Sequence, residues 1–289
     1  MIIKSYAKIN LSLNITDKTS NNYHTLNSVF AFLNIFDEIK IEKSNQYQLI
    51  INSNQILSNQ KNNLITKTIN LLKANFKNVH DNLKIILNKN IPISAGLGGG
   101  SSNAGVILLA LNKIFNLKLT KQQLIDLAIQ IGSDVPFFTQ NQAALVTNIG
   151  DKITPINDLF TNPINCIVIN PKIHLATKDV FENFNLNHSN KLSYENQNLD
   201  DFLKTATNDL TISACQLSSK ITEILDFLKN LNQVKYWQMS GSGSTCYALF
   251  NSNVNLEEKY QEIKKQFPDY LILKTQILNK IGYLKTLNR

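Results

Sequence analysis

The spacing of hydrophobic and polar residues predicts mainly strands at the start of the chain. Residues 2–15 alternate, with small and apolar side chains on one face and mostly polar ones on the other, as in a strand with one buried face. After a polar turn, the same criteria predict strands at 25–36, 39–43, 47–52 and 81–92, and a helix at 62–76.

A glycine-rich run then leads from strand to helix. Residues 101–115 have helical periodicity, and we expect Ser101 or Ser102 to cap the first turn. A second helix is expected at 119–131, with Thr120 at its start and Gly132 as a left-handed C-terminal cap. Residues 143–156 then predict a hairpin.

The pattern begins again after Pro155. It predicts a strand at 166–171, helices at 176–184, 201–210 and 212–230, and strands at 247–251 and 270–278. Strands and helices are mixed without strict alternation, which favours an α+β fold over a doubly wound sheet. We therefore predict two domains, residues 1–157 and residues 158–289.

Composition narrows the class of protein. The 289 residues carry a net charge of +8, but the lysines are scattered and no basic stripe with interleaved aromatic residues is present. We expect no nucleic-acid partner. Three widely spaced cysteines and four histidines without ligand spacing suggest neither disulfides nor a zinc site. No apolar run approaches twenty residues, so we expect a cytoplasmic protein with no membrane partner. The oligomeric state is not predicted.

Half of the glycines lie in one short segment. The chain has 10 glycines, and five of them fall within PISAGLGGGSSNAG (residues 92–105). A strand, a glycine-rich turn and a helix N-terminus form an anion site, because unpaired backbone N–H groups face the ligand with the helix dipole behind them. Ser101 and Ser102 can add hydroxyl donors or reach a metal ion. The segment is not a Walker A loop and is a poor dinucleotide fingerprint. An empty flexible turn is the alternative, although such a turn needs only one or two glycines.

Together with other short segments, this loop resembles the GHMP kinases, the family that includes galactokinase and the homoserine, mevalonate and phosphomevalonate kinases. The pieces that match in order are AKINL (7–11), YH (23–24), NLI (63–65), the glycine loop, GSDVP (132–136), NDL (208–210) and SGSG (240–243). The resemblance implies a two-domain α+β fold with a ribosomal-protein-like N-terminal domain and a ferredoxin-like C-terminal domain. It also implies an active site in the cleft between the domains.

The resemblance further implies a kinase that uses ATP and Mg²⁺. The sequence of the glycine loop is most similar to that of members that phosphorylate a cytidyl-diphospho-polyol in non-mevalonate isoprenoid synthesis. The metal ligands are not assigned. The residues implied to hold ATP are Pro92, Ile93, Ser94, Ala95, Gly96, Leu97, Gly98, Gly99, Gly100, Ser101 and Ser102. Asn63 and Lys4 are weaker candidates for the adenine side.

The implied catalytic residues are Asp134 and Lys8. By resemblance, Asp134 is the base that accepts the proton of the substrate hydroxyl, and Lys8 is its charge partner. From the residues alone, Asp134 also fits a local Asx turn and Lys8 a solvated strand face. Asn10 shares the face of Lys8 and is implied to contact the substrate.

The remaining implied contacts hold the substrate. Tyr23 and His24 would bind the cytosine, with Phe181 closing the other side of the ring and Thr177 near the polyol. Gly241 and Ser242 belong to a second glycine loop that supports the first. Here Asn21 and Asn22 replace the Asp-Gly usual before Tyr-His, a departure from the family pattern in this turn. Two alternatives stay open: another small-molecule kinase of the family, of the homoserine or mevalonate type, or a non-catalytic binder of nucleotides or nucleic acid.

Overall fold

Strand β3 (His24–Lys43) is the element on which the N-terminal strands assemble. The computed structural model describes residues 1–20, 24–53, 63–80, 82–93, 95–186, 189, 194 and 197–282. The N-terminal strands that pair antiparallel with β3 are β1 (Ile2–Asn10), β2 (Asn14–Lys18), β5 (Leu83–Asn88) and β6 (Ala144–Asn148). At the borders of this region, β4 (Gln48–Asn52) runs parallel to β5, and β7 (Lys152–Pro155) completes the predicted hairpin with β6.

Two strand predictions are corrected. Segments 25–36 and 39–43 form one strand, because pairing with β1 continues through Asp37 and Glu38. The predicted strand 2–15 is interrupted after Asn10. There the chain turns to other partners: Leu13 N donates to Thr207 O at 2.8 Å, and β2 starts one residue later.

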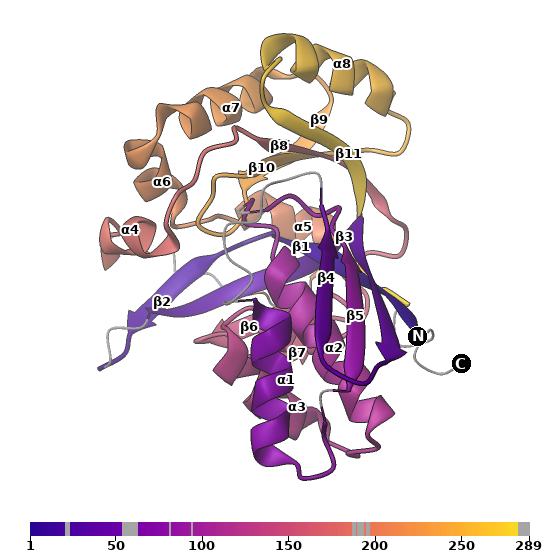
Figure 1. Cartoon of the computed structure of the whole chain (residues 1–289). Coiled ribbons are helices and arrows are strands. Elements are labelled where there is room, and N and C mark those ends of the chain that lie inside the picture. Colours follow the sequence, from indigo (N-terminus) through magenta and orange to yellow (C-terminus); the bar gives the residue numbers. More distant parts are fainter. Residues whose placement is uncertain are drawn as a thin grey trace.

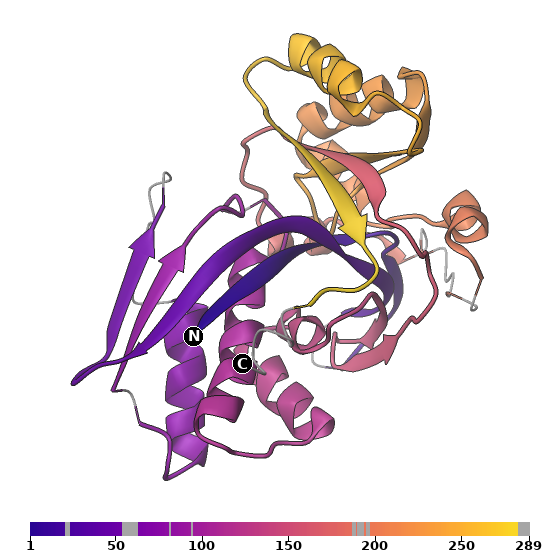
Figure 2. The same ribbon diagram turned by 90° about the vertical axis from the view of Figure 1, so that its right-hand side faces the viewer.

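The C-terminal strands form a ferredoxin-like unit. They are β8 (Ile164–Asn170), β9 (Val234–Met239), β10 (Cys246–Phe250) and β11 (Leu271–Leu278). With α7 (Ser219–Asn230) and α8 (Leu256–Gln266) they follow the order βαββαβ, and the strands lie side by side as β11–β8–β10–β9. Figures 1 and 2 show α7 and α8 together on one side of these strands.

The two halves share one continuous sheet. Strand β11 pairs with β3 through Ile277 opposite Leu33 and Leu278 opposite Phe32. This short ladder makes the order β4–β5–β3–β11–β8–β10–β9. Residues near the C-terminus therefore lie beside the central strand of the N-terminal half (Figure 2).

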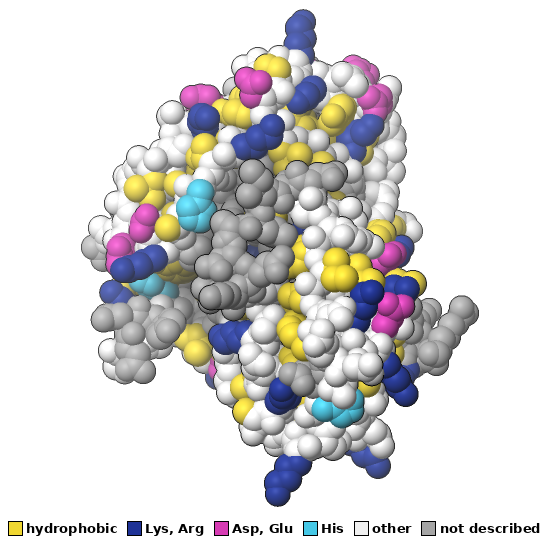
Figure 3. All heavy atoms as spheres, in the orientation of Figure 1, with side chains coloured by type: hydrophobic (Ala, Val, Ile, Leu, Met, Phe, Trp, Pro, Cys, Tyr) yellow, Lys and Arg dark blue, Asp and Glu magenta, His cyan; other side chains and the backbone are white. Residues whose placement is uncertain are grey.

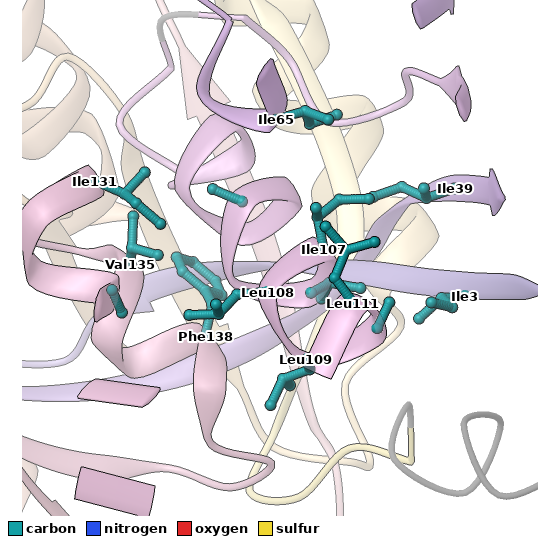
Figure 4. Close-up of a cluster of buried hydrophobic side chains, with 14 of the residues drawn as sticks. Ile3, Ile39, Ile65, Ile107, Leu108, Leu109, Leu111, Ile131, Val135 and Phe138 are labelled. Atoms are coloured by element: carbon teal, nitrogen blue, oxygen red, sulfur yellow. The ribbon is translucent and has the colours of Figure 1, made fainter. Parts of the chain in front are cut away.

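Three helices cover the N-terminal sheet: α1 (Leu64–Asn75), α2 (Gly99–Ile114) and α3 (Lys121–Ile131). The central one is α2, in which every residue from 102 to 111 is buried. Figure 4 shows Ile107 and Leu111 of α2 beside Ile3 and Ile39 of the sheet, with Ile131 and Val135 farther along the same cluster. The remaining helices are α4 (Thr177–Glu182), α5 (Leu199–Thr205), α6 (Thr211–Leu217) and the short 3₁₀ helix η2 (Val135–Thr139).

Three helix-end predictions are corrected and one is confirmed. Helix α2 begins before Ser101, because Gly98 supplies the N-cap with φ of 69° and no side chain caps the helix. Gly132 has φ of 177°, which is extended and not left-handed. The predicted helix 212–230 is two helices, since Ser218 is extended between α6 and α7. Thr120 does cap α3, in a capping box with Gln123.

Charged side chains are dispersed on the face drawn in Figure 3. Lysine side chains are spread over this face among acidic and uncharged residues, as the scattered lysines of the sequence predict. Across the described ranges, no helix has both the length and the apolar character needed to cross a bilayer.

Close packing between α2 and η2 depends on Gly105. A Cβ atom built on Gly105 would lie 2.7 Å from Cβ of Phe138 and 3.1 Å from its carbonyl carbon. Phe138 also packs edge-on against Phe137, with 5.2 Å between ring centroids. A residue without a side chain therefore lets η2, and Asp134 directly before it, come close to α2.

We predict that Gly105→Ala lowers the free energy of unfolding by about 1–3 kcal/mol, because the added methyl group overpacks the contact with Phe138. Gly100→Ala is the matched control in the same helix. Among the described residues, its Cβ would meet only Leu64 Cδ1, at 3.7 Å, and the change is expected to raise stability by roughly 0.5–1 kcal/mol. Denaturant unfolding of both variants tests this, and the opposite order of stabilities would contradict it.

Candidate active site

The predicted phosphate loop ends in an open helix N-terminus. The first intrahelical contact of α2 is Ser102 N donating to Gly98 O at 2.7 Å. The amides of Gly99, Gly100 and Ser101 precede that contact and have no partner within the helix. These N–H groups and the helix dipole favour an anion at this point.

A pocket of about 380 Å³ runs along the loop. Of the eleven residues predicted to hold ATP, nine line it: Pro92, Ile93, Ala95, Gly96, Leu97, Gly98, Gly99, Gly100 and Ser101. Ser94 lies outside the described residues. The hydroxyl of Ser102 lies instead within 2.6 Å of Ser5 Oγ and of Tyr6 O, so this side chain is committed to β1.

The far part of this pocket is apolar. Its wall includes Ile51, Leu64 and Leu87, and Asn63, the N-cap residue of α1. Lys4, the other weak candidate for the adenine side, is absent from the lining; its ammonium lies 4.1 Å from the centre of the Phe36 ring. A pocket with an apolar wall, next to a helix N-terminus that favours anions, suits a flat nucleobase such as adenine with phosphates attached.

The second glycine loop packs directly on the first. Gly96 has φ of 71°, and a Cβ on it would lie 2.9 Å from Gly243 O. The hydroxyl of Thr245 donates to Ala95 O across the same contact. Backbone therefore meets backbone here, and the two loops form one structural unit.

Lys8 and Asp134 meet beside this unit. Lys8 Nζ lies 3.3 Å from Asp134 Oδ2 and donates to Asn10 Oδ1 at 2.7 Å. The side chain of Lys8 is 4% exposed and that of Asp134 is 37% exposed, so the carboxylate remains accessible to a ligand. The structure brings these three predicted residues together.

The position of Asp134 is set by its backbone neighbours. It precedes η2 and makes no side-chain cap, so the local Asx role left open by the sequence is not adopted. A Cβ on Gly150 would lie 2.4 Å from Ser133 O, which shows how closely the β6–β7 turn presses on this segment. The backbone that carries the carboxylate is therefore fixed by close contacts on both sides of Asp134.

Asn10 links the pair to the second loop. Its backbone N–H donates to Ser240 Oγ at 3.1 Å, and its Nδ2 donates to Ser28 Oγ at 2.9 Å. A Cβ on Gly241 would lie 3.4 Å from Asn10 Oδ1 and 3.7 Å from Lys8 Nζ. Gly241 thus leaves room directly above the Lys8–Asn10 contact.

A larger pocket, of about 1,070 Å³, reaches Ser133, the residue before Asp134. Its wall includes Ser133, His24, Thr177 and Phe181. Thr177 Oγ1 lies 3.1 Å from Ser242 Oγ, which connects the pocket to the second glycine loop. Tyr23, predicted beside His24, lies outside the described residues.

His24 and Phe181 stack on each other. Their ring centroids are 5.1 Å apart and their planes are inclined by 30°. The sequence predicts them on opposite sides of a base. In this structure they contact one another directly, so a base between them requires the two rings to separate.

Sequence analysis missed two residues near the phosphate loop. Lys89, just after β5, lies in the wall of the smaller pocket, and Asp37 of β3 is buried against it with an Nζ–Oδ2 distance of 2.6 Å. An acidic residue in a largely apolar strand and a lysine three positions before the loop were the available signals. No local pattern connects them, because they are 52 residues apart.

Comparison with known proteins gives the class. The family model for the GHMP kinase N-terminal domain matches residues 63–142, and that for the GHMP kinase C-terminal domain matches residues 181–269. Together they match more than half of the chain, which belongs to the GHMP kinase family. The predicted family and its α+β fold are confirmed.

Individual relatives narrow the comparison further. The 4-diphosphocytidyl-2-C-methyl-D-erythritol kinase of Ehrlichia chaffeensis is 34% identical, over 96% of this chain and 99% of the relative. The kinase of the same name from Clostridium perfringens (strain 13) is 32% identical with the same two coverages.

Solved structures share the fold. A crystal structure of 4-(cytidine 5'-diphospho)-2C-methyl-D-erythritol kinase superimposes with a TM-score of 0.77 at 24% identity, over 98% of this chain and 100% of the other. The mevalonate kinase of Methanococcus jannaschii gives a TM-score of 0.64 at 18% identity, over 96% and 98%.

The charge state of His24 is testable. Burial, and secondly the charge of Lys18, lower the pKa of His24 below its ordinary value of about 6.5. The folded protein then binds fewer protons than the unfolded chain as the pH falls through about 6.5, so this residue's contribution to stability is lost on acidification.

We predict that an NMR titration at low ionic strength places the His24 midpoint below about 6.5, and that Lys18→Met raises it. The midpoint should stay below the ordinary value, because burial is the larger cause. Lys121→Met, at the start of α3, serves as the control and should leave the midpoint in place. A midpoint that Lys18→Met does not move would contradict the assigned cause.

Proposed function

We propose that this protein is an ATP-dependent kinase that phosphorylates the 2-hydroxyl of 4-diphosphocytidyl-2-C-methyl-D-erythritol, in the non-mevalonate route to isoprenoid precursors. The observation that carries the proposal is the Lys8–Asp134 pair, 3.3 Å apart, next to the open N-terminus of α2. The names of the relatives, more than 30% identical over nearly the full length, supply the substrate.

In the proposed reaction, Asp134 accepts the proton of the 2-hydroxyl as its oxygen attacks the γ-phosphorus of ATP, and ADP leaves. The ammonium of Lys8, which also donates to Asn10 Oδ1, stabilises the charge that develops on the attacking oxygen and the transferred group. Because the side chain of Lys8 is only 4% exposed, water screens this charge little.

The phosphates of ATP would bind the free amides of Gly99, Gly100 and Ser101, and the adenosine would lie in the apolar part of the same pocket. We include Mg²⁺ in the proposal. Within the described residues no group of three or more His, Cys, Asp or Glu side chains could hold a metal ion. Mg²⁺ at nucleotides keeps mostly phosphate and water ligands, and the Ser101 hydroxyl at the start of α2 is a side chain that suits it here. The ion would neutralise phosphate charge.

The cytidyl-diphospho-polyol would occupy the larger pocket. Thr177 lines this pocket and contacts Ser242, and Gly241 lies over the Lys8–Asn10 contact. We propose that Asn10, Thr177, Gly241 and Ser242 bind the polyol. His24 and Phe181, with Tyr23, would take the cytosine once the stacked rings separate.

We also propose the domain boundary at residues 157 and 158. The larger pocket supports it, because Lys18, His24 and Ser133 line it from one side of the boundary and Thr177 and Phe181 from the other. The reaction consumes ATP, and we propose that it takes place in the cytoplasm.

The proposed substrate can be tested against the acceptors of other kinases of the family. We predict turnover with ATP and 4-diphosphocytidyl-2-C-methyl-D-erythritol and none above background with homoserine or mevalonate. We expect this because the aromatic pair His24 and Phe181, which would bind a base, lies in the wall of a pocket of about 1,070 Å³. A coupled ADP-release assay with each acceptor measures this, and turnover of homoserine or mevalonate alone would refute the choice.

The base is tested by Asp134→Asn. We predict retained ATP binding and a fall in turnover of roughly two or more orders of magnitude, because an amide cannot accept the proton. Asp126→Asn, on the exposed face of α3, is the matched control and should keep full activity. Unchanged turnover in Asp134→Asn would show that this residue is not the base. A wild-type protein that binds ATP without any turnover would favour the non-catalytic alternative.

A further inference from the structure

A second buried ion pair lies at the phosphate loop and has no role in the mechanism above. Asp37 of β3 is fully buried, and the side chain of Lys89, just after β5, is 9% exposed. Lys89 Nζ lies 2.6 Å from Asp37 Oδ2. Two charges out of water are costly, and an apolar pair often serves stability as well or better. The pair therefore calls for a further reason.

The carboxylate of Asp37 is fully used as an acceptor. Oδ1 accepts from the backbone N–H groups of Asn90, at 2.8 Å, and Ile91, at 2.7 Å. Oδ2 accepts from Asn103 Nδ2 at 3.0 Å in addition to Lys89. Asp37 thus joins the entry to the glycine loop, the second turn of α2 and the lysine.

Lys89 is different, because its ammonium reaches the pocket. A Cβ on Gly99 would lie 2.8 Å from Lys89 Nζ, so this charge sits at the first residue of α2. Among the described residues that line the smaller pocket, Lys89 is the one with a charged side chain. An ammonium has three donors, and the bond to Asp37 takes one of them.

Lys8 and Lys89 contact neighbouring glycines. The stem of Lys8 would meet a Cβ on Gly98, at 3.0 Å from its Cγ, and its ammonium faces Asp134. Lys89 lines the smaller pocket together with the apolar residues Leu64 and Leu87. The cations thus divide between the side of the reacting hydroxyl and the side of the nucleoside.

We propose that Lys89 binds a phosphate oxygen of the nucleotide on the nucleoside side of the triphosphate, and that Asp37 is a positioning residue that holds the ammonium over the first turn of α2. The inference rests on the proposed function, since it takes the smaller pocket as the ATP site. The lysine supplies a directed positive charge to the same anion that the free amides bind.

Binding measurements separate the phosphate contact from a contact to the base. By calorimetry on the full chain, Lys89→Met should weaken ADP binding by about tenfold or more, as expected for loss of a charge-assisted hydrogen bond, and leave adenosine binding unchanged. Lys84→Met, on β5 but outside the pocket wall, is the matched control for a distant charge and should bind ADP as the wild type does. Equal binding of ADP by Lys89→Met, or an equal loss for adenosine, would overturn the phosphate contact.

The role of Asp37 is tested by a double replacement. Asp37→Asn alone leaves a buried ammonium without its carboxylate and should lower both thermal stability and ADP affinity. Asp37→Asn combined with Lys89→Met removes both charges; it should regain much of the lost stability but bind ADP as weakly as Lys89→Met alone. Recovery of ADP affinity together with stability would show that the pair is merely structural.

The outcome for the wild type separates this inference from the function on which it rests. A wild-type chain that binds neither ADP nor ATP would overturn both. Tight binding by the wild type and by Lys89→Met would overturn only the role of Lys89.

Discussion

The buried ammonium of Lys8 is the contact on which the site depends. The backbone N–H of Lys8 donates to Leu97 O at 3.0 Å, which links β1 to the glycine loop. The side chain of Lys8 contacts Asn10 and Asp134. The side chain of Lys8 is 4% exposed, and burying an ammonium costs free energy unless acceptors surround it. The acceptors that this buried ammonium needs therefore bring a carboxylate and an amide oxygen close to the N-terminus of α2, where the amides without an intrahelical partner lie.

Glycine acts here mainly by letting backbones touch. Gly96 meets Gly243, Gly150 meets Ser133 and Gly105 meets Phe138, each at a distance that a Cβ would make shorter than 3.0 Å. The first contact joins the two glycine loops, and the other two hold the segment before and after Asp134. The geometry of the site thus depends on missing side chains as much as on polar ones. This explains why the glycines of a glycine-poor chain lie at these close contacts.

Much of this could be read from the sequence. The alternation in residues 2–10 and the helical periods of α1, α2 and α3 identify elements correctly because one face of each is buried. The start of α2 was missed because Gly98, not a serine, turns the chain. Ser102 was chosen for its hydroxyl, but that group bonds to β1, and Lys89 was overlooked because its partner Asp37 is distant in sequence. Local pattern does not encode such long-range pairing.

The stack of His24 on Phe181 has a consequence for recognition. With 5.1 Å between their centroids, each ring occupies the surface that an incoming base would cover. Under the proposed function, the protein carries its own competitor for the base, and an acceptor is bound only as tightly as its intrinsic affinity multiplied by the fraction of molecules in which the stack is open. Small polyols without an aromatic group would gain nothing from displacing the stack, so selectivity would be exercised before any phosphate is transferred.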